Sequence, residues 1–342
     1  YCNLEITFIH PSGLPPWSRF SRNNSQSRKK SEDMAEVIIS THGASFADIV
    51  AIARDGAKVV ISKESLAAMQ KSRDHVEALA ASDTPVYGIS TGFGALANRH
   101  VSTDLRTQLQ RSLIRSHAAG VGAPVEVEVV RALMALRLKT LASGRTGVRP
   151  VVAQTMAAIL NAGITPLVRE FGSLGCSGDL APLAHCALVL MGEGEAVDRE
   201  GVSKPVAQLF KEAGIKPVQL AEKEGLALIN GTDGMLGMLI LAIHDLRNLV
   251  DSADVVAAMS VEGLLGTDRV FIPELHAPLR SHPGQAISAA RMLATLAGSG
   301  IVASHLNNDD RVQDAYSLRC APQVAGAVRD TIEYAAIVAE RE

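Results

Sequence analysis

The chain has 342 residues, of which 47% are hydrophobic and only 4% aromatic, and its formal net charge at pH 7 is −3. A nearly neutral chain lacks the basic excess by which proteins bind nucleic acid, and this apolar content is typical of a globular protein. The cysteines are few and irregularly spaced, which argues against a disulfide scaffold or a structural zinc site and fits a reducing cytoplasm; they are Cys2, Cys176, Cys186 and Cys320.

The first 33 residues differ from the rest of the chain. They begin with Tyr1 rather than Met, are rich in Ser, Arg, Asn and Pro, and show no helical period before Met34. They also lack the apolar run of a signal peptide. We interpret residues 1–33 as an extraneous or disordered leader, translated from upstream of the true start, with a basic targeting arm as the alternative.

Residues 35–81 mix short apolar runs with charged helical stretches, and residues 66–79 have the spacing of an amphipathic helix. Residues 87–94 contain three glycines, which predicts a flexible loop. The apolar pattern then indicates helices over 104–117, 125–142 and 151–161, and glycines stand just after the last two.

A second glycine-rich loop is expected over residues 171–179, followed by a helix that begins near Pro182 and continues to Met191. A polar stretch with Gly and Pro runs to about Glu224. A long helical pattern covers 235–265, and helices resume near 285 and 323.

No segment of the chain is predicted to span a membrane. The longest uncharged stretch, residues 150–168, contains polar residues and a proline, so we expect a buried helix and a turn. The last helical pattern reaches Glu342 without a cap, which we interpret as a C-terminal truncation. The pattern as a whole predicts a mainly α protein, in which a mixed N-terminal part leads into a bundle of long helices.

The loop that contains Cys176-Ser177-Gly178 has the sharpest signal. It is neither a dinucleotide-binding GxGxxG motif nor a P-loop, and an isolated Cys-Ser-Gly would be a plain turn. The wider string Gly-Ser-Leu-Gly-Cys-Ser-Gly-Asp-Leu-Ala-Pro-Leu-Ala-His, residues 172–185, resembles the signature of the aromatic amino acid ammonia-lyases. Three further strings resemble motifs of that family in the same order, within a resemblance that covers about residues 86–327: Tyr-Gly-Ile-Ser-Thr-Gly-Phe-Gly (87–94), Leu-Ile-Asn-Gly-Thr (228–232) and Val-Gln-Asp-Ala-Tyr-Ser-Leu-Arg-Cys (312–320).

The resemblance implies an electrophile built from the backbone, with no external cofactor and no metal. The nitrogen of Gly178 would attack the carbonyl carbon of Cys176, and Ser177 would lose water and become dehydroalanine in a methylidene-imidazolone ring. The family most often has Ala where this chain has Cys176, but the first residue contributes only its carbonyl. Asp179 is placed to move protons during ring closure.

The resemblance also implies an L-aspartase/fumarase-like long-helix bundle, with a mixed N-terminal part that carries the electrophile loop. We therefore expect an electrophile-bearing domain over residues 34–230 and the start of the central helical bundle over residues 231–342. Family members are longer at the C-terminus and form homotetramers whose active sites combine residues of several subunits. We expect a chain that ends at Glu342 to lose the tetramer and most activity.

Several residues take roles from the family motifs. Tyr87 is the candidate catalytic base, on a loop that would close over substrate. Arg319 suits the substrate carboxylate, because its planar guanidinium matches two oxygens. Asn230 and Gln313 would hydrogen-bond the ring or the substrate amine, and Tyr316 the ring oxygen or the carboxylate.

Substrate choice is predicted by Ser116-His117, which looks like the histidine type of the family. His117 can hydrogen-bond an imidazole, which a phenyl ring could not reciprocate. The expected reaction is therefore elimination of ammonia from L-histidine to give trans-urocanate, the first step of histidine degradation. The alternatives are a phenylalanine or tyrosine ammonia-lyase, an aminomutase, or a truncated chain without activity. No nucleic-acid or membrane partner is expected. The remaining histidines considered show no metal-ligand spacing: His185, His244, His276, His282 and His305.

Overall fold

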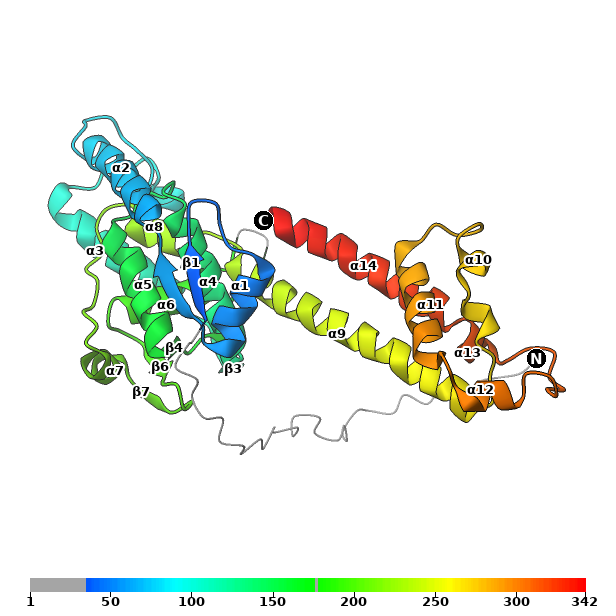
Figure 1. The fold of residues 1–342 in the computed structure, drawn as a ribbon. Coiled ribbons are helices and arrows are strands. Elements are labelled where there is room, and N and C mark those ends of the chain that lie inside the picture. Colours follow the sequence, from blue (N-terminus) through cyan, green and yellow to red (C-terminus); the bar gives the residue numbers. More distant parts are fainter. Residues whose placement is uncertain (1–34, 176–177) are drawn as a thin grey trace, which may run out of the picture. The chain divides into compact units, whose positions relative to one another are not determined.

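The computed structural model describes residues 35–175 and 178–342 (Figure 1). The interpretation of residues 1–33 and the predicted modification of Cys176 and Ser177 concern positions outside this range. The described chain is mainly α-helical with three small sheets, which confirms the predicted fold class. Ala35–Glu342 form one compact unit. The division into domains near residue 230 stays a prediction.

The mixed N-terminal part begins with two parallel strands, β1 (Glu36–Ile39) and β2 (Lys58–Ile61), joined through α1 (Phe46–Val50) and a π-helical turn. Asn161 covers the open edge of β2: its Oδ1 accepts from the Val59 N–H at 2.7 Å, and its Nδ2 donates to the Val59 carbonyl at 2.9 Å. An edge strand that is satisfied in this way cannot pair with another chain. The small sheet is therefore fixed to the helix that carries Asn161.

The predicted helices of the first half are confirmed, with small shifts of their ends. α4 is buried along most of its length in the main apolar core, together with parts of α5 and α6. α5 ends at Gly163, whose φ of +74° is the left-handed conformation that terminates helices. The helices are α2 (Lys63–Ala80), α3 (Thr103–His117), α4 (Val127–Ala142), α5 (Pro150–Ala162) and α6 (Leu180–Leu190).

The prediction of a plain polar stretch before Glu224 was incomplete, because this stretch contains strands and a helix. β6 (Glu195–Val197) pairs with both β4 (Thr165–Pro166) and β7 (Ser203–Pro205), and α7 (Val206–Ala213) follows. Strands of two or three residues are too short to show an alternating pattern. For the same reason Phe171, expected in the loop, instead ends β5 (Arg169–Phe171), which pairs with β3 (Val121–Pro124).

The second half is organised around α9 (Asp233–Gly263), which follows the short α8 (Glu224–Ile229). The first part of α9 packs on α4, and further along it contacts α11 (Pro283–Leu296) and α14 (Ala321–Arg341), both predicted. Short helices that the sequence pattern did not predict connect them: α10 (Pro273–His276), α12 (Gly300–Ser304) and α13 (Tyr316–Arg319), with a 3-10 turn at Arg269–Phe271. Another 3-10 turn, Gly94–Leu96, lies in the first half, between α2 and α3.

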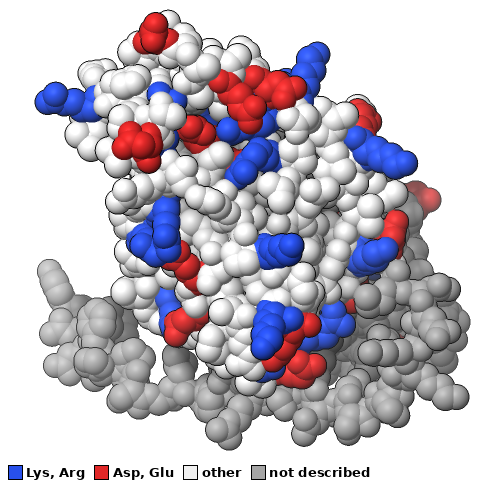
Figure 2. Space-filling view, turned by 90° about the vertical axis from the view of Figure 1, so that its left-hand side faces the viewer, with Lys and Arg blue, Asp and Glu red and all other residues white. Residues whose placement is uncertain are grey.

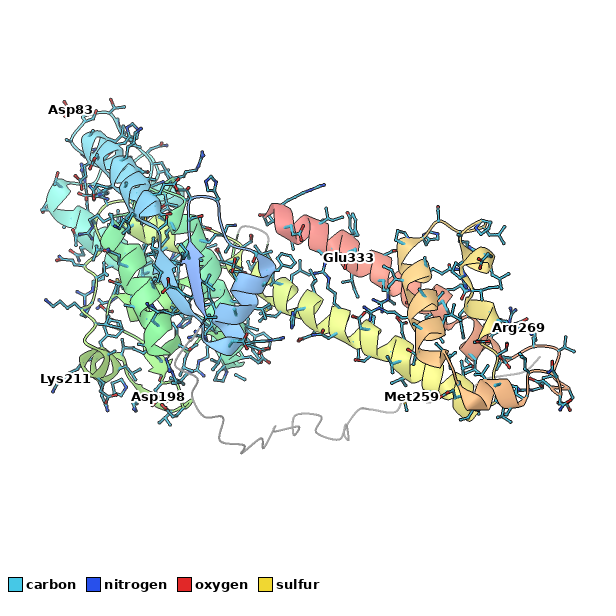
Figure 3. The ribbon with its side chains drawn as sticks, viewed as in Figure 1. Asp83, Asp198, Lys211, Met259, Arg269 and Glu333 are labelled. Carbon is cyan, nitrogen blue, oxygen red and sulfur yellow. The ribbon has the colours of Figure 1, made fainter. Side chains whose placement is uncertain are left out.

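Ion pairs set the position of α14 on α9. Arg329 donates to Asp251 at 2.7 Å and to the buried Asp254 at 2.6 Å. Arg247 of α9 pairs at 2.7 Å with Glu333 of α14, which is labelled in Figure 3. These pairs fix the rotation of one helix against the other, which an apolar contact alone would leave less defined.

One long apolar segment bears on the prediction that no part of the chain spans a membrane. The helical segment Glu224–Gly263 is long and apolar enough to cross a membrane by length and composition, although the sequence pattern indicated no such segment. Half of its most apolar window is buried inside the fold, as in the core helix of a bundle. On the face shown in Figure 2, Lys and Arg lie among Asp and Glu rather than in a continuous basic patch.

Candidate functional site

Two backbone segments meet immediately after the tripeptide. The Asp179 N–H donates to the Gly231 carbonyl at 2.7 Å. Gly178 has a φ of +112°, and a Cβ at this position would lie 2.7 Å from the same carbonyl oxygen. Because both the backbone angle and the close approach exclude a side chain, glycine is required here. Cys176 and Ser177, which precede this contact, are not among the described residues.

The Asp179 side chain holds the loop from both sides. The residue is 2% exposed, and its carboxylate accepts from the Gly234 N–H at 2.8 Å and the Met235 N–H at 3.0 Å, in the first turn of α9. It also accepts from the Ser173 hydroxyl at 2.6 Å. A carboxylate at the N-terminus of a helix is stabilised by the free N–H groups and by the helix dipole. The loop is therefore anchored before and after the tripeptide.

His117 stands at the C-terminal end of α3 with a defined tautomer. Its Nδ1 lies 2.9 Å from the Leu113 carbonyl, and a carbonyl can only accept, so Nδ1 is the donor. In the neutral ring Nε2 is then the acceptor. The Ser116 hydroxyl donates to the same carbonyl at 2.9 Å.

The segment after His117 lies against the electrophile loop. The Gly120 N–H donates to His185 Nε2 at 3.1 Å, and a Cβ on Gly172 would lie 3.1 Å from the Gly120 Cα. Burial, with a smaller contribution from Arg169, lowers the pKa of His185. A neutral His185 can accept this hydrogen bond. His185, the last residue of the string 172–185, therefore links the segment after His117 to that string.

The Tyr87 loop packs on α8. A Cβ on Gly88 would lie 2.6 Å from Leu226 Cδ2 of that helix. Tyr87 is 48% exposed, its hydroxyl accepts from the Gly94 N–H at 3.4 Å, and its ring meets Phe93 edge-on at 6.1 Å. The candidate base is thus held by its own loop and remains open to solvent.

Asn230 ends α8, directly before Gly231. Its Nδ2 donates to the Leu226 carbonyl at 2.9 Å, and the residue is exposed. Since α8 also contacts α3 and α6, the structure brings three of the motifs and the His117 segment around one place: residues 87–94, 117–120, 172–185 and 228–232.

The fourth motif is not brought to this place within one chain. Leu318, beside Arg319, packs with Ala258 and Val261 near the C-terminal end of α9. Because α9 has 31 residues, its two ends are about 45 Å apart. Gln313 and Tyr316 are exposed. The Arg319 guanidinium lies over the Tyr316 ring at 4.7 Å from its centroid, a cation–π contact, and Arg319 itself is half-buried.

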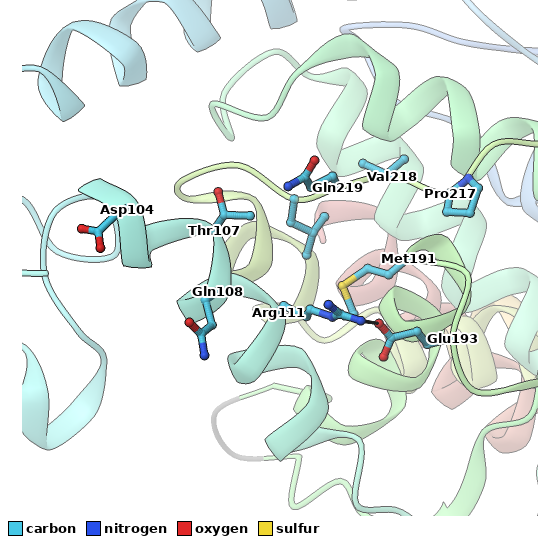
Figure 4. A pocket seen from close by; sticks show the side chains of 10 residues that line it. Asp104, Thr107, Gln108, Arg111, Met191, Glu193, Pro217, Val218 and Gln219 are labelled. Carbon is cyan, nitrogen blue, oxygen red and sulfur yellow. Dashed lines mark hydrogen bonds and ion pairs between the residues drawn. The ribbon is translucent and has the colours of Figure 1, made fainter. Parts of the chain in front are cut away.

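A mainly apolar cavity of about 310 Å³ lies beside the loop, lined by Leu174, Asp179, Met235 and Met238 among others. A larger groove of about 740 Å³ lies between α3 and residues 217–220, where Arg111 and Glu193 pair at 2.8 Å (Figure 4). None of the candidate residues that the structure describes lines this groove. The volume of a cavity therefore does not identify the functional site.

Sequence reasoning missed the charged pair beneath the site. Arg137 of α4 is 3% exposed and pairs with Asp233, the first residue of α9, which is 6% exposed. The signal was present, since Arg137 stands between Leu136 and Leu138 in α4, and a buried charge requires a partner. Burial raises the pKa of Asp233, and the charge of Arg137 opposes this shift.

Cys186 also lies in this buried region. Burial raises the pKa of its thiol, and the nearby Asp233 adds to the effect. Because the thiolate is the reactive form, Cys186 is not a candidate nucleophile.

Known proteins resemble this chain over most of its length. The family described as aromatic amino acid lyase matches residues 44–342. Histidine ammonia-lyase of Streptomyces coelicolor is 63% identical over 309 residues, 90% of this chain and 60% of that protein. The chain therefore spans about 60% of the length of this relative.

Solved structures of other proteins are also similar to this chain. Tyrosine aminomutase from Streptomyces globisporus aligns with a TM-score of 0.81 and 39% identity, over 87% of this chain and 59% of that one. Histidine ammonia-lyase from Trypanosoma cruzi aligns with a TM-score of 0.77 and 34% identity, over 87% of this chain and 55% of that one.

Proposed function

Because the chain belongs to the aromatic amino acid lyase family, we propose that the full-length protein is a histidine ammonia-lyase, which converts L-histidine to trans-urocanate and ammonia in the cytoplasm as the first step of histidine degradation. The observation that carries the choice of substrate is His117, whose Nδ1 is engaged by the Leu113 carbonyl at 2.9 Å. In the neutral ring its Nε2 can accept a hydrogen bond from an imidazole N–H, which a phenyl ring lacks. A phenol O–H can donate to the same nitrogen, so the choice against tyrosine rests on Ser116, where the tyrosine type of the family has a bulkier apolar residue.

The electrophile would be the methylidene-imidazolone ring of Cys176-Ser177-Gly178, with no external cofactor. The surroundings fit such a ring: Gly178 has a backbone angle that favours glycine, and Asp179 is anchored on both sides. When formed, the ring supplies an electrophilic carbon that activates the substrate amine as a leaving group.

The protein's own residues would bind the substrate and move its proton. Tyr87 takes the β-proton as the base, on a glycine-rich loop that can close and exclude water. Asn230 and Gln313 orient the amine and the ring through hydrogen bonds, and Tyr316 binds the ring oxygen or the carboxylate. Arg319 binds the carboxylate through its planar guanidinium.

The distance between the motifs supports an assembly of several copies, which we propose to be the homotetramer of the family. Arg319 lies near the far end of the 31-residue α9 from Asp233, so another copy would supply Gln313, Tyr316 and Arg319 to the loop of the first. α9 and α14 also expose apolar side chains suited to contact between copies: Leu249 (62%), Val256 (60%), Met259 (61%), Val324 (67%) and Tyr334 (71%).

The proposal is tested by intact mass and ultraviolet absorbance of the purified protein, followed by substrate assays. Ring formation removes the mass of two water molecules and adds a near-ultraviolet band, and both should be absent from Ser177→Ala. Ammonia release should occur from L-histidine. An unmodified tripeptide in a protein that deaminates histidine would refute the electrophile.

The second candidate is a lyase or aminomutase for phenylalanine or tyrosine, favoured by the likeness to tyrosine aminomutase. Activity on either of these amino acids, without activity on histidine, would establish it instead. A chain that contains the ring but acts on neither histidine, phenylalanine nor tyrosine would support the alternative of a truncated chain without activity.

A further inference from the structure

A buried ion pair lies next to Gly231, the residue that Gly178 and Asp179 contact. Arg137 is 3% exposed, pairs with Asp233 through Nη2, and donates from Nη1 to the Ala227 carbonyl at 3.0 Å. Its two contacts fall on either side of Gly231. One guanidinium therefore holds both the end of α8 and the start of α9.

The position of Gly231 depends on this guanidinium. A Cβ on Gly231 would overlap Arg137 Nη2 and the Asp233 carboxylate, so the backbone lies directly on the ion pair. The opposite side of Gly231 offers its carbonyl to the Asp179 N–H at 2.7 Å. The contacts thus run in series from Arg137 through Gly231 to Gly178 and Asp179.

The ion pair is not explained by stability. Removing two charges from water costs several kcal/mol for each ion, and apolar replacements of such pairs are often neutral or stabilising. Arg137 Nε, moreover, is buried without a hydrogen-bond partner in the described part of the chain. A costly and incompletely satisfied pair, directly beneath a constrained glycine contact, indicates a role in positioning.

We propose that Arg137, together with Asp233, is a positioning residue for the electrophile: the pair holds the Gly231 carbonyl where it orients the Gly178–Asp179 peptide for ring closure. This inference rests on the proposed function, since it concerns formation of the ring. Arg137 does not touch the substrate. It acts through Gly231, and its loss should slow or prevent the cyclisation that removes two waters.

The experiment compares ring content in the full chain and in variants, by intact mass and near-ultraviolet absorbance, with thermal unfolding recorded in parallel. Arg137→Met removes the guanidinium. Arg137→Met/Asp233→Asn removes both charges at nearly constant volume, and so avoids an unpaired buried charge. Arg137→Lys keeps the charge but lacks the second nitrogen, so it cannot contact both Asp233 and the Ala227 carbonyl as the guanidinium does.

Arg131→Met is the matched control. Arg131 lies on the same helix, is 7% exposed, and donates only to the backbone carbonyls of Ile52 and Leu160. Its loss should lower the melting temperature without reducing ring content. If Arg137 had a merely structural role, its loss would likewise lower the melting temperature without reducing ring content. Comparison of the two arginine variants therefore distinguishes an effect on stability from an effect on positioning.

The expected result is a fall in ring content of at least about tenfold in Arg137→Met and in the double variant, with a measurably slower closure in Arg137→Lys after synthesis. A double variant that melts cooperatively and carries the full ring would overturn the inference. A wild-type rate of closure in Arg137→Lys would overturn it equally, even if the other variants fail to fold. An unmodified wild-type chain would instead refute the proposed function on which the inference rests.

Discussion

The backbone N–H of Asp179 donates to the carbonyl of Gly231 at 2.7 Å. This bond joins the segment after the Cys-Ser-Gly tripeptide to the Leu-Ile-Asn-Gly-Thr string (228–232). In the sequence the two segments are far apart. It also explains the glycines at both places. A side chain on Gly178 would meet the carbonyl of Gly231, and one on Gly231 would meet Arg137.

Gly231→Ala should therefore disrupt both the fold and the ring. The new methyl group would overlap Arg137 and Asp233, and relief of such overpacking typically costs about 1–3 kcal/mol. We expect a lower melting temperature and less ring by intact mass. Gly263→Ala is the control, because nothing lies within 4 Å of its Cβ position. It should leave the ring unchanged, and an equal loss in both variants would contradict the argument.

Asp179→Ala should destabilise the start of α9. The Gly234 and Met235 N–H groups and the Ser173 hydroxyl would lose their acceptor, and unsatisfied buried groups cost roughly 1–3 kcal/mol. Urea unfolding measures the loss. Asp198→Ala, made in a Lys204→Ala background, is a useful comparison, since Asp198 also accepts from two backbone N–H groups in a partly exposed turn, and otherwise pairs with Lys204 at 2.8 Å. If Asp198→Ala costs as much as Asp179→Ala, burial is not the cause.

His185 should make stability depend on pH. Its pKa is lowered in the folded protein, mainly by burial, so the unfolded chain binds the proton more readily. The stabilisation is therefore complete above the ordinary pKa of about 6.5 and is lost as the pH falls from there toward the lower folded value. Urea unfolding at about pH 8 and about pH 5 should show this loss. His185→Gln should show a smaller difference, and an unchanged difference would rule out this assignment.

Cys186 should be unreactive in the native protein. It is 4% exposed, and its raised pKa keeps the thiol protonated. Peptide mapping after treatment with iodoacetamide should find it unlabelled under native conditions and labelled in urea. Cys320 is half-buried and provides an internal comparison. Native labelling of Cys186 as fast as that of Cys320 would show that the site opens readily.

His117→Phe should change the substrate preference of the assembled enzyme. A site that hydrogen-bonds its substrate rejects an analogue that cannot pair by large factors, so we expect kcat/KM for histidine to fall by about 100-fold or more. His244→Phe is the control, since His244 is exposed on α9 and contacts Asn248. Unchanged kcat/KM for histidine in His117→Phe would remove the basis for the choice of substrate.

Much of the helical architecture could be predicted from local pattern. α2, α3, α4 and α5 follow apolar spacing and end near glycines or capping residues, which are short-range effects. The hairpin of β6 and β7 was missed, because strands of three residues carry no period and form through pairing with distant segments. The short helices α10, α12 and α13 were missed because their four or five residues lie below the length of a recognisable pattern.

The sequence by itself determined the order of residues around Gly178, the histidine at 117 and the arginine at 319, and their resemblance to family motifs indicated an ammonia-lyase before any coordinates. Only the tertiary structure decided which of them meet. It brought His185 to Gly120, Asp179 to Gly231 and Arg137 to Asp233, and it placed Arg319 near the C-terminal end of α9. The physical reason is that burial and hydrogen bonding between distant segments depend on packing, which no local pattern encodes.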